Sequence, residues 1–140
     1  MLVSTHPRTR SRLERAGLGP IPGIEFHEPF GFFDYVHLQM YARCTLSDSG
    51  TTGEESSILG FPAVSLREST ERPEALDTGA ILLAGLDPAG LREEIETATT
   101  TTAACPADYE ITDTSDRVTA FVLSTVRRHH EWAGIRVPRS

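Results

Sequence analysis

The sequence has few positively charged residues and no long apolar run, and these two shortages argue against nucleic acid and membranes as partners. Thirteen basic residues, all arginine, face 20 acidic ones, so the formal net charge is −7. Such a charge repels a nucleic-acid backbone or an anionic membrane on average. No apolar stretch approaches the ~18 residues of a membrane-spanning helix, and the first residues lack the apolar core of a secretion signal. We expect no nucleic-acid or membrane partner and a cytoplasmic location.

Cysteine is scarce as well. Cys44 and Cys105 lie far apart, and neither belongs to a Cys-x-x-Cys pair, which excludes a disulfide framework and a zinc knuckle. We expect free thiols. The adjacent His129 and His130 are not expected to form a metal site, because at 3.6 residues per turn neighbouring side chains diverge by about 100°. The sequence predicts no metal and no cofactor.

What is present is an alternation of short apolar runs with amphipathic stretches, in a chain short enough for one domain, residues 1–140. The apolar runs predict strands at residues 2–5, 24–27, 44–47, 63–66 and 80–84. The other stretches predict helices at residues 8–16, 32–42, 52–59, 71–76, 88–96 and 115–130. Residues 97–104 are expected to fray or form a loop, and residues 115–140 to form a C-terminal helix and tail. This order is typical of an α/β fold, a Rossmann-like parallel sheet with helices on both faces.

Polar residues gather where the predicted strands end, and the richest segment is Asp48-Ser49-Gly50. Ligands of parallel sheets bind beyond the carboxyl ends of the strands. A helix that starts after Gly50 would present free backbone N–H groups and the positive end of its dipole to an anion. Ser49 and Thr51 add hydroxyl groups. A capping box between the threonines and the glutamates that follow would explain the same residues without a ligand.

Arg72 follows the next strand and so reaches the same crevice. A guanidinium group can grip a phosphate through two parallel hydrogen bonds, although an ion pair with Glu71 or Glu74 is the alternative. Glu54 and Glu55 are unusual beside an anion, unless one faces away and the other accepts hydrogen bonds from sugar hydroxyls. These residues together predict a nucleotide diphosphate site.

Six segments between residues 2 and 86 form a set of motifs. They are Thr5-His6-Pro7-Arg8-Thr9, Phe32-Phe33-Asp34-Tyr35, Asp48-Ser49-Gly50, Glu54-Glu55, Leu59-Gly60-Phe61-Pro62 and Thr70-Glu71-Arg72-Pro73-Glu74. In this order they closely resemble the C-terminal lobe of the non-hydrolysing UDP-N-acetylglucosamine 2-epimerases. Three further segments are similar to the branch that acts on UDP-2-acetamido-2,6-dideoxy-L-hexoses in N-acetyl-L-fucosamine synthesis. They are Pro29-Phe30-Gly31-Phe32, Val36-His37-Leu38-Gln39 and Ser56-Ser57-Ile58-Leu59.

The resemblance implies one lobe of a two-lobed, glycosyltransferase-B-like fold that binds UDP or a UDP-N-acetylhexosamine. It implies that Ser49, Gly50 and Thr51 contact the diphosphate, although many family members have glycine in place of Thr51. Glu55 matches the residue that binds the ribose hydroxyls, and Arg72 matches one that contacts the sugar nucleotide.

Two further assignments by resemblance have plain structural alternatives. Tyr35 falls where an aromatic ring lies beside the uracil in relatives, and core packing is its alternative. His6 matches a catalytic histidine that faces the diphosphate and assists the departing UDP. Without the motif, a lone histidine at a strand end would be a solvated residue.

The family reaction resembles an elimination of UDP across C1–C2 of the sugar, followed by re-addition with C2 inverted. It requires carboxylates that move the C2 proton and a stabilised leaving group. By resemblance this chain supplies the second, whereas the carboxylates come from an N-terminal lobe. Glu28 and Glu68 match no catalytic position and are expected to be solvated. We expect the isolated chain to be inactive and an N-terminal lobe, in cis or in trans, to complete it.

Two other functions stay open at this point: a non-catalytic UDP-sugar binding module, and the nucleotide-binding lobe of a two-lobed glycosyltransferase. The motif at residues 70–74 favours the epimerase over the glycosyltransferase. An apolar stripe on the last predicted helix should pack on the core or on another domain. If it stays uncovered it predicts self-association, so we expect a homo-oligomer. The stripe consists of Val118, Phe121, Val122 and Val126.

Overall fold

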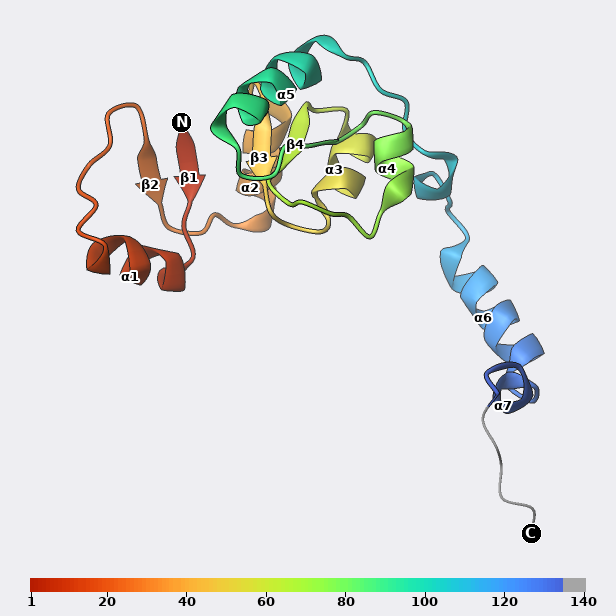
Figure 1. The fold of residues 1–140 in the computed structure, drawn as a ribbon. Coiled ribbons are helices and arrows are strands. Elements are labelled where there is room, and N and C mark those ends of the chain that lie inside the picture. Colours follow the sequence, from red (N-terminus) through yellow and green to blue (C-terminus); the bar gives the residue numbers. More distant parts are fainter. Residues whose placement is uncertain (135–140) are drawn as a thin grey trace.

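The computed structural model describes residues 1–134, which form two small parallel sheets with helices around them (Figure 1). One sheet pairs β1 with β2, and the other has the strand order β3-β4-β5. The strands are β1 (Leu2–Ser4), β2 (Glu25–His27), β3 (Thr45–Ser47), β4 (Ala63–Ser65) and β5 (Leu82–Leu83). All pairings are parallel. The expected α/β fold is confirmed, with its five strands divided between two sheets instead of one.

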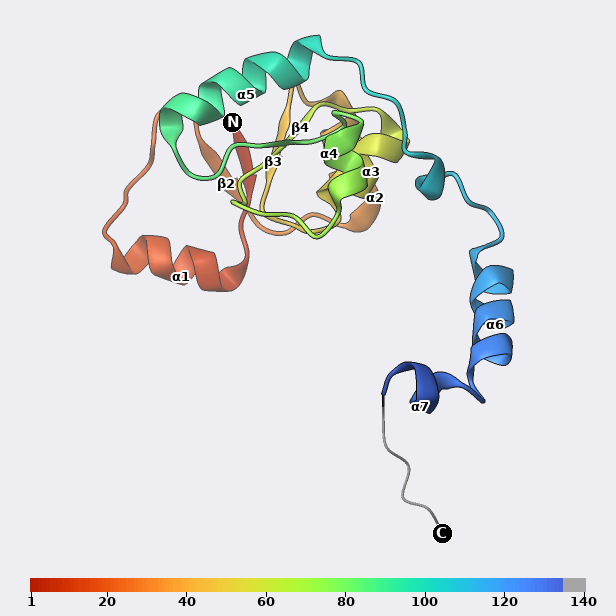
Figure 2. The same ribbon diagram turned by 45° about the vertical axis from the view of Figure 1, so that its right-hand side comes forward.

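A helix follows every strand in the alternating part of the chain, and three short helical segments come afterwards. The alternating helices are α1 (Pro7–Arg15), α2 (Phe32–Tyr41), α3 (Thr52–Leu59), α4 (Pro73–Asp77) and α5 (Pro88–Thr100). The later segments are η1 (Ala107–Tyr109), α6 (Thr114–Thr125) and α7 (His129–Trp132). In Figures 1 and 2, α5 lies along one side of the β3-β4-β5 sheet, and α3 and α4 lie on the other.

Local chemistry sets several helix ends where the sequence predicts them. Gly60 ends α3 with φ 73°, a left-handed conformation that favours glycine. At the start of α5 the Gly90 backbone N–H donates to Asp87 Oδ2 at 2.8 Å, and Pro88 takes the first helical position. Both ends confirm the expectation from the sequence.

Two helix predictions are wrong in part. The threonine-rich stretch is helical as far as Thr100, since its hydroxyls donate to carbonyls one turn back and so fit inside a helix, as from Thr97 to Glu93 at 3.0 Å. The single helix predicted at residues 115–130 is divided into α6 and α7. Helix α6 ends at Thr125 with Val126 as its C-cap residue, and α7 begins at His129.

The core is small and centres on β4. Val64 is fully buried, and the core cluster consists of Phe61, Ala63, Ala75 and Ile81. Helix α3 approaches this core closely, because a Cβ atom on Gly53 would lie 3.2 Å from Ala75 Cβ. The buried Ser56 hydroxyl contacts two backbone carbonyls, those of Phe61 at 2.7 Å and Ala80 at 2.8 Å. These contacts fix α3 against β4 and α4.

Helices α6 and α7 extend away from the α/β body in both views (Figures 1 and 2). The predicted apolar stripe on α6 is exposed, between 50% at Val122 and 66% at Phe121. The stripe does not pack on the core of this chain, so the prediction that it packs on the core is wrong. That another domain or a second copy of the chain covers it stays a prediction. The end of the predicted C-terminal tail, residues 135–140, lies outside the described residues. Within residues 1–134 no helix is long and apolar enough to cross a membrane.

Candidate functional site

A pocket lies at the carboxyl ends of β3, β4 and β5, where the sequence predicts a ligand crevice. Three of the predicted site residues line it: Ser49, Gly50 and Arg72. Arg67, which the sequence analysis does not single out, lines the same pocket. In this pocket two arginine residues therefore lie together with the loop that precedes α3.

The start of α3 has no side-chain cap on its backbone N–H groups. Thr51 is the N-cap residue, but its side chain makes no capping hydrogen bond and instead donates to Glu55 Oε1 at 2.7 Å. The Ser49 and Thr51 hydroxyl oxygens lie 3.1 Å apart. The capping-box alternative is therefore wrong for Thr51. The first N–H groups of α3 stay available to an anion.

Glu55 is also held by a hydrogen bond from helix α2. The buried Gln39 donates from Nε2 to Glu55 Oε2 at 2.8 Å, so each carboxylate oxygen accepts one hydrogen bond. Tyr35 lies one turn earlier on α2, and its pKa is raised, first by burial and then by the negative charges of Glu55 and Asp48. The charge of Glu55 thus reaches Tyr35. Sequence reasoning missed Gln39, although its i,i+4 spacing from Tyr35 places both on one helix face.

Arg72 forms an ion pair with Glu54, its Nε lying 2.8 Å from Oε1. The partners weighed from the sequence, Glu71 and Glu74, are not the ones found. Only the Nε group is used, so the two terminal amino groups of the guanidinium remain for an anion. The adjacent glutamates therefore face different ways, Glu54 toward Arg72 and Glu55 toward α2.

Tyr109 connects the chain beyond α5 to this region. Its hydroxyl donates to Glu74 Oε1 at 2.9 Å. Burial first, and then the bond to Glu74, raise the pKa of Tyr109 to about 12. A backbone hydrogen bond first, and then Tyr109, lower the pKa of Glu74. Because Glu74 lies in the first turn of α4, this bond fixes the helix that begins directly after Arg72.

The geometry agrees with comparisons to known proteins. The family model described as UDP-N-acetylglucosamine 2-epimerase matches residues 1–123. This chain belongs to that family. The epimerase of Methanococcus maripaludis is 40% identical over 100 residues, which cover 69% of this chain and 27% of the relative. The epimerase of Escherichia coli K12 is 34% identical over 93 residues, 66% of this chain and 24% of the relative.

Solved epimerase structures share the fold. The UDP-N-acetylglucosamine 2-epimerase from Rickettsia bellii superposes with a TM-score of 0.76 at 38% identity, over 96% of this chain and 39% of that one. The Methanocaldococcus jannaschii enzyme in complex with UDP-GlcNAc and UDP gives a TM-score of 0.75 at 29% identity, over 88% and 35%. This chain spans about a quarter of the length of the curated relatives it matches. The expected fold, a lobe of a glycosyltransferase-B-like enzyme, is confirmed.

The histidine of the epimerase motif lies apart from this pocket. His6 stands at the carboxyl end of β1, is exposed, and caps α1 by accepting a hydrogen bond from the Arg8 backbone N–H at 3.2 Å. It is not among the residues that line the pocket. Its catalytic assignment stays a prediction.

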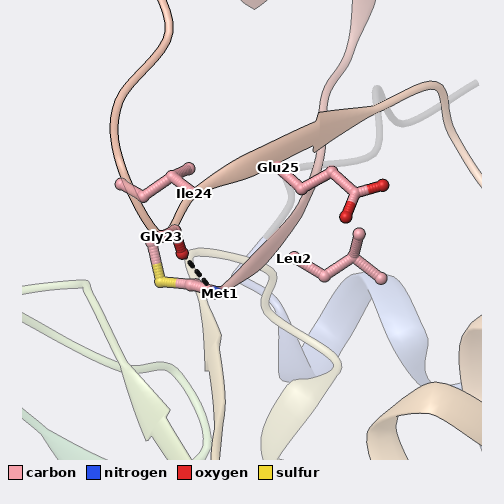
Figure 3. Close-up of a pocket in the computed structure, with 5 residues that line it drawn as sticks. All are labelled: Met1, Leu2, Gly23, Ile24 and Glu25. Carbon is pink, nitrogen blue, oxygen red and sulfur yellow. Dashed lines mark hydrogen bonds between the residues drawn. The ribbon is translucent and has the colours of Figure 1, made fainter.

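Two other features lie outside the predicted site. An open hollow at the amino ends of β1 and β2 is lined by Met1, Leu2, Gly23, Ile24 and Glu25, and there the Met1 amino group donates to the Gly23 carbonyl (Figure 3). It lies at the strand ends opposite to those that carry the predicted site. Glu28 and Glu68 are exposed, as expected, and Glu28 pairs with Arg10 at 3.2 Å.

Replacing Tyr109 with phenylalanine should lower stability in a pH-dependent way. The lowered pKa of Glu74 gives a contribution that is present above its ordinary value of 4.5 and lost as pH falls below it. The raised pKa of Tyr109 gives one that is present below pH 10.0 and lost as pH rises toward about 12. The difference in unfolding free energy from wild type should therefore be largest between these limits and shrink on either side.

Urea unfolding across this pH range measures the difference. Tyr41→Phe is the matched control, because Tyr41 is 77% exposed. A difference between wild type and Tyr109→Phe that stays constant with pH would contradict the role given to the Tyr109–Glu74 bond.

Proposed function

We propose that this chain is the UDP-binding, C-terminal part of a non-hydrolysing UDP-N-acetylglucosamine 2-epimerase and binds the UDP moiety of a UDP-N-acetylhexosamine. The observation that carries the proposal is the convergence of Ser49, Gly50 and Arg72 on one pocket at the uncapped start of α3. Family membership supports it, and so does the likeness to a relative whose structure contains UDP-GlcNAc and UDP. The comparisons favour an epimerase over a glycosyltransferase.

The diphosphate would lie at the start of α3. A charge-assisted hydrogen bond from Arg72 contributes on the order of 1.5 to 3 kcal/mol, and the helix terminus roughly 0.3 to 2 kcal/mol. The Thr51 hydroxyl, which donates to Glu55 here, would turn to donate to a phosphate oxygen. These terms together are enough for appreciable affinity for UDP.

The nucleoside would lie toward α2. Each oxygen of Glu55 accepts one hydrogen bond within the protein, and a carboxylate oxygen has room for a second, from a ribose hydroxyl. Tyr35 is half-buried and within reach of the charge of Glu55, and its ring would stack on the uracil. Glu55 and Tyr35 are thus proposed as the nucleoside-binding pair.

In this proposal residues 1–140 form one lobe, with residues 115–140 as its terminal helix and tail, and an N-terminal lobe completes the active site in cis or in trans. That lobe supplies the carboxylates that remove and return the C2 proton. This lobe stabilises the departing diphosphate, with His6 assisting when the enzyme closes. Preference for a UDP-2-acetamido-2,6-dideoxy-L-hexose and a cytoplasmic location stay predictions.

Titration with UDP tests the binding site. Arg72→Ala should weaken UDP binding about tenfold or more, equivalent to roughly 1.4 kcal/mol, and Ser49→Ala should weaken it less. Calorimetry of the purified chain measures both. Arg117→Ala is the control, because Arg117 is also a paired surface arginine, 2.7 Å from Asp113, but lies on α6. A dissociation constant for UDP that Arg72→Ala leaves unchanged would remove Arg72 from the site.

The chain alone should not epimerise a UDP-N-acetylhexosamine, because proton transfer at C2 has no positioned base. Incubation in heavy water followed by mass spectrometry measures exchange of the C2 proton. We expect no deuterium in the sugar from the isolated chain and incorporation once an N-terminal lobe of a relative is added. Deuterium at C2 with the isolated chain would show that it contains a base of its own.

We further propose that the exposed stripe of α6 is covered by a second copy of the chain, which would make it a homo-oligomer. Val122→Glu should then shift the sedimentation profile toward the monomer, since it places a charge in an apolar contact. Ala120→Glu is the matched control, because 3.6 residues per turn place Ala120 on the opposite side of α6. A monomeric wild-type profile would refute self-association.

A further inference from the structure

Arg67 is the second arginine of the pocket, and none of the assignments above uses it. It follows β4, whose last residue is Ser65, and lines the pocket together with Ser49, Gly50 and Arg72. Its backbone N–H donates to Ser65 Oγ at 3.3 Å, which sets the direction in which the chain leaves the strand. The side chain thus starts from a fixed point on the sheet.

The guanidinium of Arg67 lies over the loop that leads into α3. Its Nη1 atom is 3.4 Å from the point that a Cβ atom on Gly50 would occupy. Because Gly50 has no side chain, the Arg67 guanidinium lies close to the loop backbone, where a Cβ atom would be in van der Waals contact with it. The uncapped N–H groups of α3 follow directly after this loop.

Arg67 also differs from Arg72 in its partners. Arg72 is held by Glu54 at 2.8 Å, whereas within residues 1–134 no carboxylate forms an ion pair with Arg67. Its side chain is partly buried, and removing a charged group from water without a partner costs free energy. A phosphate group bound in the pocket beside Arg67 would supply the missing negative charge.

We propose that Arg67 is a second diphosphate-binding residue, which contacts the ligand from the β4 side while Arg72 contacts it from the α4 side. The inference rests on the proposed function, because it needs UDP in this pocket. Two guanidinium groups would neutralise the diphosphate as it separates from the sugar, which is the step that needs the most charge stabilisation. Arg67 would then act on leaving-group departure as well as on binding.

The test compares ligands with and without phosphate. UDP and uridine are titrated into wild type, Arg67→Ala, Arg72→Ala and Arg92→Ala, the last being an exposed α5 residue whose loss changes the net charge equally. Arg67→Ala should weaken UDP binding about tenfold or more and leave uridine binding within about twofold of wild type. Arg92→Ala should change neither.

The outcomes separate this inference from the proposed function. If wild type binds UDP and Arg72→Ala weakens it but Arg67→Ala does not, the inference fails alone. If Arg67→Ala weakens UDP and uridine equally and lowers the urea midpoint, Arg67 has a structural role and the inference also fails. If wild type does not bind UDP, the proposed function fails and takes the inference with it.

Discussion

The close approach of α3 to the core is the constraint on which the rest of this lobe depends. Gly53 has no side chain, so the helix backbone comes within reach of Ala75, where a Cβ atom would be only 3.2 Å away. The Ser56 hydroxyl contacts the carbonyls of Phe61 and Ala80 and so ties the segments before β4 and β5 to the same helix. With α3 fixed in this way, its amino end faces the carboxyl ends of the strands. This one helix carries both glutamates, and through Glu54 it holds Arg72, which lines the pocket.

The two adjacent glutamates explain how an acidic helix start can still accept an anion. Consecutive positions on a helix diverge by about 100°, so Glu54 meets Arg72 beside α4 and Glu55 meets Gln39 on α2. One carboxylate holds a cation in place, and the other is turned toward the side where a ribose would lie. Within residues 1–134 neither carboxylate forms an ion pair with Arg67. The two negative charges are therefore adjacent in sequence but point in different directions in the structure.

Sequence alone predicts the parts of this lobe that depend on nearby residues. The bounds of α3, the Gly60 end and the Asp87 cap depend on residues within one or two turns, and the structure agrees with each. The partners missed are distant along the chain: Tyr109 meets Glu74 across 35 positions, and Gln39 meets Glu55 across 16. Arg67 was missed because nothing in its immediate sequence marks it. It enters the candidate site only because the fold brings it next to Gly50, which follows a different strand, β3.

The contact between Tyr109 and Glu74 also limits how far α6 can move from the pocket. Tyr109 is anchored on α4, and α6 begins at Thr114, five Cα-to-Cα steps later. Such a tether reaches at most about 18 Å when fully extended. Any domain or second copy that covers the apolar stripe of α6 is therefore connected by this short tether to α4, the helix that follows Arg72. Any force that moves α6 outward therefore acts through Tyr109 on Glu74, which is two residues from Arg72, proposed to bind the nucleotide.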